Sequence, residues 1–156
     1  MKRAPLQVLV PVIHSLVVLD SDGDRLLAKY YDGRNKQEQL SFESLVNKKT
    51  RNVPAKVDAE AILLDHEVVV FRSSADCKFF VCGSSMENEL ILVAVLDAIF
   101  DTVHSLLRGQ ADKRTMLENL ELVLLTIDEV IDHGHIFELD AAAICSRVLM
   151  RGADSS

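Results

Sequence analysis

The segment IHSLVVLDSDGDRLLAKYY (residues 13–31) determines how the fold begins. Residues 12–19 are rich in β-branched and aliphatic side chains, which is typical of a buried strand. The polar run 20–24 contains Gly23, which tolerates positive φ, and Asp and Ser side chains that can bond the local backbone. The pattern therefore predicts a β-hairpin whose second strand spans about residues 25–31.

A helix is expected directly after the hairpin, over about residues 36–50. Asn35 is placed to cap its N-terminus, and Glu38 stands three residues later, where it completes a capping box. One face of this helix is apolar and should be buried. That face consists of Phe42, Leu45 and Val46.

The rest of the chain contains three short strand-like segments and then three helical ones. The strands are expected over about 61–64, 68–72 and 78–82. Short polar turns at residues 65–67 and 73–76 separate them, and connections this short join antiparallel neighbours. The helices are expected over about 88–108, 113–132 and 140–150. The order β-β-α-β-β-β-α-α-α describes an α/β (α+β) domain.

A single domain accounts for the 156 residues. We expect residues 1–11 to be an N-terminal lead-in, residues 12–150 the domain, and residues 151–156 a flexible tail. Hydrophobic residues make up 49% of the chain, so another chain could cover part of its surface, although a well-filled core explains the same composition. The longest apolar run, residues 90–96, is too short to span a bilayer.

The net charge of −7 makes nucleic acid a poor ligand, because phosphate contacts need clustered Lys and Arg. One basic cluster stands near the end of the first helix. It could contact an acidic membrane surface or a partner, but a solvated helix end is the simpler interpretation. The cluster consists of Lys48, Lys49, Arg51 and Lys56.

We find no pattern that predicts catalysis, a cofactor or a metal. The six glycines form no phosphate-binding loop. His133 and His135 stand near three carboxylates, which are suitable metal ligands, but an ordinary polar loop between helices is the better interpretation. The three cysteines are scattered, and a strand over 78–82 places Cys77 and Cys82 on opposite faces. A disulfide framework is therefore not expected, which favours a reducing compartment.

Two helices carry more apolar surface than one buried face requires. In the first half of helix 88–108 the side chains are apolar on all sides, so we expect cover by later helices of the chain or by a partner. Leu122 and Leu125 lie opposite the expected core face of helix 113–132, between Glu118 and Glu129. These positions are our candidate partner-binding residues. The full set is Leu90, Val93, Ala94, Leu122 and Leu125.

The strand and helix order and several long segments together resemble the zeta subunits of coatomer, the COPI vesicle coat. The resemblance covers most of the chain and is carried by residues 13–31, 42–50, 60–65, 68–83, 88–108 and 117–141. Residues 20–31 also look like the sigma subunits of clathrin adaptors, whereas VLLTIDEVIDHG (residues 123–134) looks more like zeta.

This resemblance implies a longin-like fold, with a five-stranded antiparallel sheet and helices on both faces. It implies a non-enzymatic subunit bound to the trunk of the gamma coatomer subunit, recruited to Golgi membranes through an Arf-class GTPase. The implied setting is the cytoplasmic side of Golgi membranes and COPI vesicles. A sigma-type adaptor subunit and the longin domain of a SNARE remain alternatives.

Overall fold

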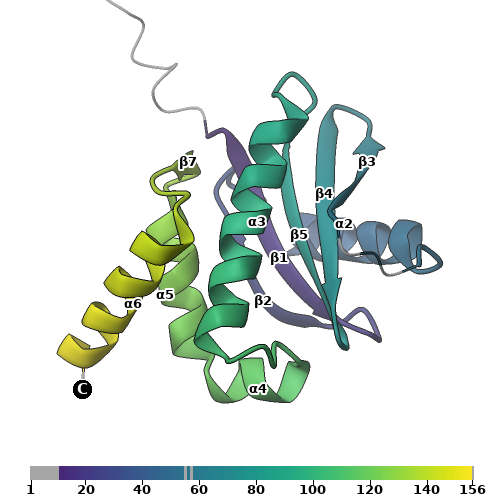
Figure 1. Cartoon of the computed structure of the whole chain (residues 1–156). Helices are drawn as coiled ribbons and strands as arrows, with labels where there is room; N and C mark the ends of the chain where they lie inside the picture. The colour runs from purple at the N-terminus through teal and green to yellow at the C-terminus, as the bar shows by residue number, and fades with distance from the viewer. Residues whose placement is uncertain (1–10, 55, 57, 156) are drawn as a thin grey trace, which may run out of the picture.

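The computed structural model describes residues 11–54, 56 and 58–155. Its centre is a five-stranded antiparallel sheet in the order β2-β1-β5-β4-β3 (Figure 1). The strands are β1 (Ile13–Asp20), β2 (Arg25–Tyr30), β3 (Glu60–Leu64), β4 (Glu67–Ser74) and β5 (Cys77–Ser84). This sheet confirms the predicted number of strands and their antiparallel pairing.

Helices cover both faces of the sheet, as predicted (Figure 1). Helix α2 packs on one face, and α3, α5 and α6 contribute to the core on the other. The helices are α2 (Lys36–Thr50), α3 (Glu89–Leu106), α4 (Lys113–Glu118), α5 (Leu120–Val130) and α6 (Ala141–Ser155). Two short strands, β6 (Ile131–Asp132) and β7 (His135–Ile136), form a hairpin between α5 and α6.

The central strands bury side chains on both faces, which explains their nearly continuous apolar sequence. In β1, Leu16 and Val18 belong to the core beneath α3, whereas Val17 and Leu19 belong to the core beneath α2. Strand β5 alternates in the same way, and its Cys77 and Cys82 lie on opposite faces, as predicted. Burial raises the pKa of the Cys77 thiol to about 12.

Helix α2 begins with the predicted capping box. The Asn35 side chain accepts a hydrogen bond from the Glu38 backbone N–H at 2.9 Å, and the Glu38 carboxylate accepts one from the Asn35 N–H at 3.0 Å. Phe42 and Val46 are buried, but Leu45 is 41% exposed. The prediction that Leu45 belongs to the buried face is therefore wrong, because α2 contacts the sheet over a narrower stripe than its apolar residues suggested.

The single helix predicted over residues 113–132 is wrong. The chain leaves helical geometry at Asn119 (φ −125°, ψ 31°), which separates α4 from α5, and α5 ends at Val130. The Asn119 side chain donates to the Thr115 carbonyl at 2.8 Å and so closes α4. This break changes the register of the buried face: Met116 is fully buried, whereas Leu117 is 46% exposed.

Helix α6 begins where predicted and ends later. The Asp140 carboxylate accepts a hydrogen bond from the Ala142 N–H at 3.2 Å, as expected of an N-cap. The helix continues to Ser155, so the end predicted near Met150 is too early. Of the predicted N-terminal lead-in, only Pro11 lies within the described residues.

The β6–β7 hairpin places Gly134 directly against the start of the sheet. Gly134 has φ +84°, and a Cβ added there would lie 2.3 Å from Pro11 Cβ and 3.0 Å from Ile13 O. We expect Gly134→Ala to lower the free energy of unfolding by at least ~2 kcal/mol, since left-handed backbone costs 1–2 kcal/mol and the clash adds to it. Thermal or urea unfolding measures this change.

Gly33→Ala is the matched control for Gly134→Ala. Gly33 also has positive φ (+80°), but nothing lies within 4 Å of an added Cβ. This variant should lose only the backbone contribution, about 1 kcal/mol. Equal losses in the two variants would contradict a close contact between the hairpin and the sheet.

Candidate partner-binding surface

The first turns of α3 expose apolar side chains beyond the end of the sheet. Asn88 caps the helix by accepting from the Leu90 N–H at 2.9 Å. Leu92 points inward and is fully buried against Gly83, where an added Cβ would lie 2.8 Å from Leu92 Cδ2. Leu90 points outward and is 71% exposed. Met86 and Ile91 are exposed beside it, and we call Met86, Leu90 and Ile91 the α3 start.

The chain's own helices cover only part of the apolar first half of α3. Val93 is half-buried and packs against the core, and Ala94 is half-buried. Both α5 and α6 contact α3. Leu90 remains largely in solvent, so self-cover by later helices, one of the two explanations we considered, does not account for it. The role of Leu90, Val93 and Ala94 in partner binding remains a prediction.

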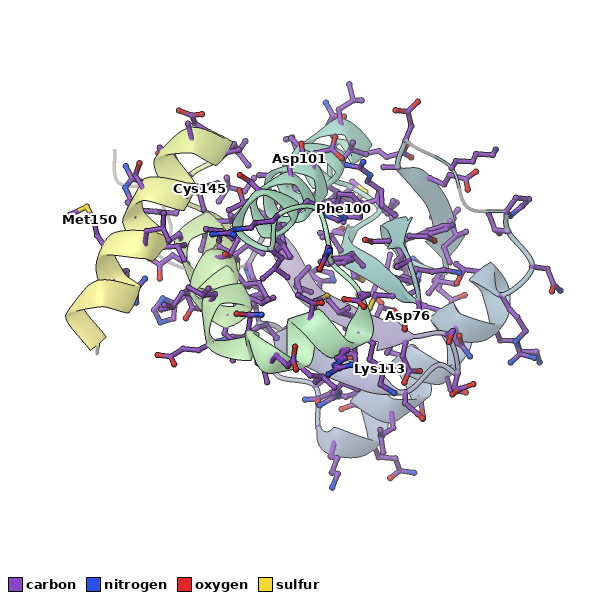
Figure 2. The ribbon with its side chains drawn as sticks, turned by 60° about the horizontal axis from the view of Figure 1, so that its bottom comes forward. Asp76, Phe100, Asp101, Lys113, Cys145 and Met150 are labelled. Atoms are coloured by element: carbon purple, nitrogen blue, oxygen red, sulfur yellow. The ribbon has the colours of Figure 1, made fainter. Side chains whose placement is uncertain are left out.

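The polar stripe that follows on α3 is tied to the neighbouring strand β4. Arg72 stacks its guanidinium 3.8 Å from the centre of the Phe100 ring and pairs with Asp97 at 2.9 Å. Asp101 accepts a longer contact of 3.5 Å from the same guanidinium, and Figure 2 shows Phe100 and Asp101 together on this helix. These contacts join the middle of α3 to strand β4.

Leu122 and Leu125 lie in a different environment from the one predicted. Both are half-buried and pack against the core, in a groove of about 260 Å³ between α5 and α6. An atom added at Gly152 of α6 would lie 3.7 Å from Leu122 Cδ2. Glu129, expected at a solvated rim, is 8% exposed and pairs with Arg151 at 2.7 Å. The predicted placement of these leucines opposite the core is wrong, because α6 packs on that side.

Helix α6 carries its own exposed apolar residues on the outer side of this groove. Leu149 is 56% exposed and Met150 is 66% exposed. Figure 2 shows Met150 near the outer end of α6, far from the labelled residues of α3. The surface around Leu122 and Leu125 is therefore an edge between two helices of the same chain, to which a partner could add contacts.

One group of possible metal ligands in the described part of the chain is an ion-pair network. Glu67 Oε2 accepts a hydrogen bond from His14 Nδ1 at 2.6 Å, contacts Cys82 Sγ at 3.2 Å and also pairs with the Arg34 guanidinium. Burial alone would raise the pKa of Glu67, but the bonds from His14 and Cys82 and the charge of Arg34 lower it. The guanidinium would repel a metal cation at the same oxygen.

The His133 and His135 loop forms the turn of the β6–β7 hairpin. The His133 side chain is 93% exposed and pairs with Asp132 at 2.7 Å. Glu138, the third carboxylate considered there, pairs with Arg147 at 3.0 Å instead. The other metal-ligand group among the described residues is the acidic turn Asp20, Asp22 and Asp24, in which Asp20 is buried and the other two are exposed. Lys113 already pairs with Asp20 at 2.9 Å.

The sequence of this chain is similar to those of known vesicle-coat proteins. The sequence model of the clathrin adaptor complex small chain family matches residues 12–155. The chain belongs to this family. Among its relatives, coatomer subunit zeta-1 of Homo sapiens is 44% identical over 91% of this chain and 79% of its own length. Coatomer subunit zeta-3 of Arabidopsis thaliana is 40% identical over 94% of this chain and 82% of its own length.

The fold of this adaptor small chain also matches a chain of an adaptor complex. A homology model of the full-length AP-3 complex in a stretched open conformation contains a chain that superposes with a TM-score of 0.72. The match covers 92% of this chain and 96% of that one at 13% identity, which is a likeness of fold. The predicted likeness to coatomer zeta is confirmed, and the chain is a small subunit of a vesicle coat.

The Glu67 network gives this adaptor small chain a testable pH dependence. Because the folded pKa of Glu67 lies below its ordinary value of 4.5, its contribution to stability is present above that value and is lost as pH falls through the folded pKa. Glu67→Gln should therefore be less stable than wild type at pH 7, and the difference should narrow below about pH 4. Chemical unfolding across pH measures it.

Glu118→Gln is the control for the pH series. Glu118 is 61% exposed in a loose pair with Arg114, so its loss should leave the acid limb of the stability curve unchanged. A constant gap between Glu67→Gln and wild type from pH 7 to pH 3 would contradict the network.

Proposed function

We propose that this chain is the zeta-type small subunit of coatomer and that it binds the trunk of the gamma subunit. The identity of 44% with a coatomer zeta subunit over 91% of the chain carries this proposal. The exposed α3 start supports it, because Leu90 is an aliphatic side chain that a stable partner would cover.

The proposed role is non-catalytic and belongs to Golgi-to-endoplasmic-reticulum retrograde and intra-Golgi transport. The subunit would act on the cytoplasmic side of Golgi membranes and COPI vesicles, where an Arf-class GTPase recruits the coat. The described residues include no helix long and apolar enough to cross a bilayer. Membrane attachment through the assembled coat is consistent with that observation.

The proposal also assigns a contact surface. The gamma trunk would cover the α3 start and Val93 and Ala94 beside it, where side chains are apolar and the polar stripe of α3 begins only at Asp97. Leu122 and Leu125 would contribute from the edge of the α5–α6 groove. An apolar centre bordered by charged residues matches the usual anatomy of a stable interface.

Co-expression tests this assignment. The full chain should form a 1:1 complex with a coatomer gamma trunk on gel filtration and be more soluble with it than alone. The large-subunit trunk of a clathrin adaptor, expressed in the same way, is the control and should not form the complex. A well-behaved monomer that ignores the gamma trunk would contradict the proposal.

A further inference from the structure

A hollow of about 210 Å³ lies at the end of the sheet opposite the α3 start. It is bounded by the β1–β2 turn, the β4–β5 turn and the end of α2. Strand β5 begins at this end of the sheet, and α3 starts only after β5 has crossed to the other end. Its floor is apolar, with Leu19, Val53 and Phe80. The other lining residues are mostly polar and include both cations and carboxylates.

Two cations, Lys78 and Arg51, line this hollow. Lys78 is half-buried, donates from Nζ to the Thr50 carbonyl at 2.9 Å and lies 5.8 Å from the centre of the Phe71 ring. Burial lowers the pKa of Lys78. Arg51 is exposed and also lines the hollow. Neither cation forms an ion pair within the described residues.

Unpaired cations are concentrated at this end of the molecule. Most of the described Lys and Arg side chains form ion pairs with carboxylates, as expected in a chain of net charge −7. The unpaired ones among the described residues are Lys36, Lys48, Lys49, Arg51, Lys78 and Arg108. Four of these six belong to the last turn of α2 or to the hollow beside it. The dipole of one helix end does not require four cations.

Two carboxylates, Asp20 and Asp76, also line the hollow. Asp20 is already satisfied, because it pairs with Lys113 at 2.9 Å and accepts from the Asp22 and Asp24 N–H groups. Asp76 Oδ1 accepts from the Lys113 backbone N–H at 2.8 Å and from Cys77 Sγ at 3.6 Å, and the residue is exposed; Figure 2 shows Asp76 and Lys113 side by side at this end. Asp76 therefore remains available to accept hydrogen bonds from a ligand's hydroxyl groups.

We propose that this hollow binds a phosphorylated polyol, of the kind found in inositol phosphate headgroups. The phosphate would lie against Arg51 and Lys78, because charge-assisted donors are what an anion requires. The polyol hydroxyls would donate to Asp76 and exchange hydrogen bonds with Ser73, which pairs with Lys78 across β4 and β5 and also lines the hollow. The volume is many times the ~10–15 Å³ that one water needs by the same kind of measure, which leaves room for a small ligand. Lys48 and Lys49 would face further anionic headgroups of a membrane.

Titration of the full chain with myo-inositol 1,4-bisphosphate, followed by isothermal calorimetry and by NMR, tests this site. Wild type should show saturable binding, with shifts at residues lining the hollow. Arg51→Gln with Lys78→Gln should weaken binding about tenfold or more, since each removes a charge-assisted hydrogen bond. Lys36→Gln with Arg108→Gln removes the same charge elsewhere and should leave affinity within about twofold.

Three further experiments distinguish this site from its alternatives. Arg51→Gln alone, at an exposed position, decides the matter if the Lys78 variant fails to fold. Inorganic phosphate should bind at least about tenfold more weakly, because it lacks the hydroxyls. Vesicles with and without phosphatidylinositol phosphate distinguish a lipid headgroup from a soluble inositol phosphate, and binding of either kind supports the site. No saturable binding, equal loss in both double variants, or equal affinity for inorganic phosphate (an adventitious ion only) would overturn it.

Discussion

Leu90→Glu should abolish the complex with the large subunit while leaving the isolated chain folded. Leu90 is 71% exposed in the first turn of α3, so the change should alter the free energy of unfolding by no more than about 0.5 kcal/mol. A carboxylate is also well tolerated at a helix N-terminus. In the complex, the same carboxylate would be buried without a partner, and binding should weaken by at least ~30-fold.

Leu40→Glu provides the control for Leu90→Glu. Leu40 is also an exposed leucine (53%), but it lies on α2, on the other face of the sheet. That variant should bind like wild type in the same pull-down, and circular dichroism should report the same fold for both variants. Undiminished binding by Leu90→Glu would remove the α3 start from the interface.

Leu122→Glu is expected to destabilise the isolated chain. Leu122 is half-buried, packs against the core and approaches Gly152 of α6. A carboxylate there would lose its water and detach α6 from α5, at an expected cost of about 2–4 kcal/mol. For a domain of this size such a loss corresponds to a fall in Tm of roughly 5–15 °C, which thermal circular dichroism can measure.

Leu149→Glu is the control that tests whether the loss of stability in Leu122→Glu comes from burial of the side chain. Leu149 lines the same groove but is 56% exposed, so its variant should unfold within a few degrees of wild type. If Leu122→Glu instead kept the wild-type Tm and lost only partner binding, Leu122 would be an interface residue, as the sequence hypothesis held. Losses of both would show that the groove edge serves the fold and the interface together.

The sequence was sufficient for the sheet because its signals are local and consistent. The apolar run of β1, the polar turn at Gly23 and the capping box of Asn35 and Glu38 predict element boundaries within one residue of those in the structure. The connections between the three later strands are too short for parallel crossovers, so they predict antiparallel pairing. The sequence also predicted the surplus apolar surface at the α3 start, because a helix that is apolar on all sides has more apolar surface than one core contact can bury.

The C-terminal third was harder to predict because tertiary packing decides it. Residues 113–132 keep an apolar pattern of helical period across Asn119, so periodicity alone gives no sign of the break. The sequence does carry one signal for the β6–β7 hairpin, which is Gly134 between Ile131 and Ile136. Glycine readily adopts positive φ, and both His133 and Gly134 have positive φ in the turn. Two such residues between apolar partners are typical of a tight hairpin turn.

The central claim is that this chain is a subunit of coatomer, and isolation of the tagged full chain from cytosol tests it most directly. Quantitative mass spectrometry of the bound proteins should find the gamma coatomer subunit at a 1:1 ratio and the other coatomer subunits with it. Recovery should fall to background for a chain carrying Leu90→Glu and remain at the wild-type level for Leu40→Glu. Recovery of clathrin adaptor large subunits instead of coatomer, or of the chain alone, would contradict the claim.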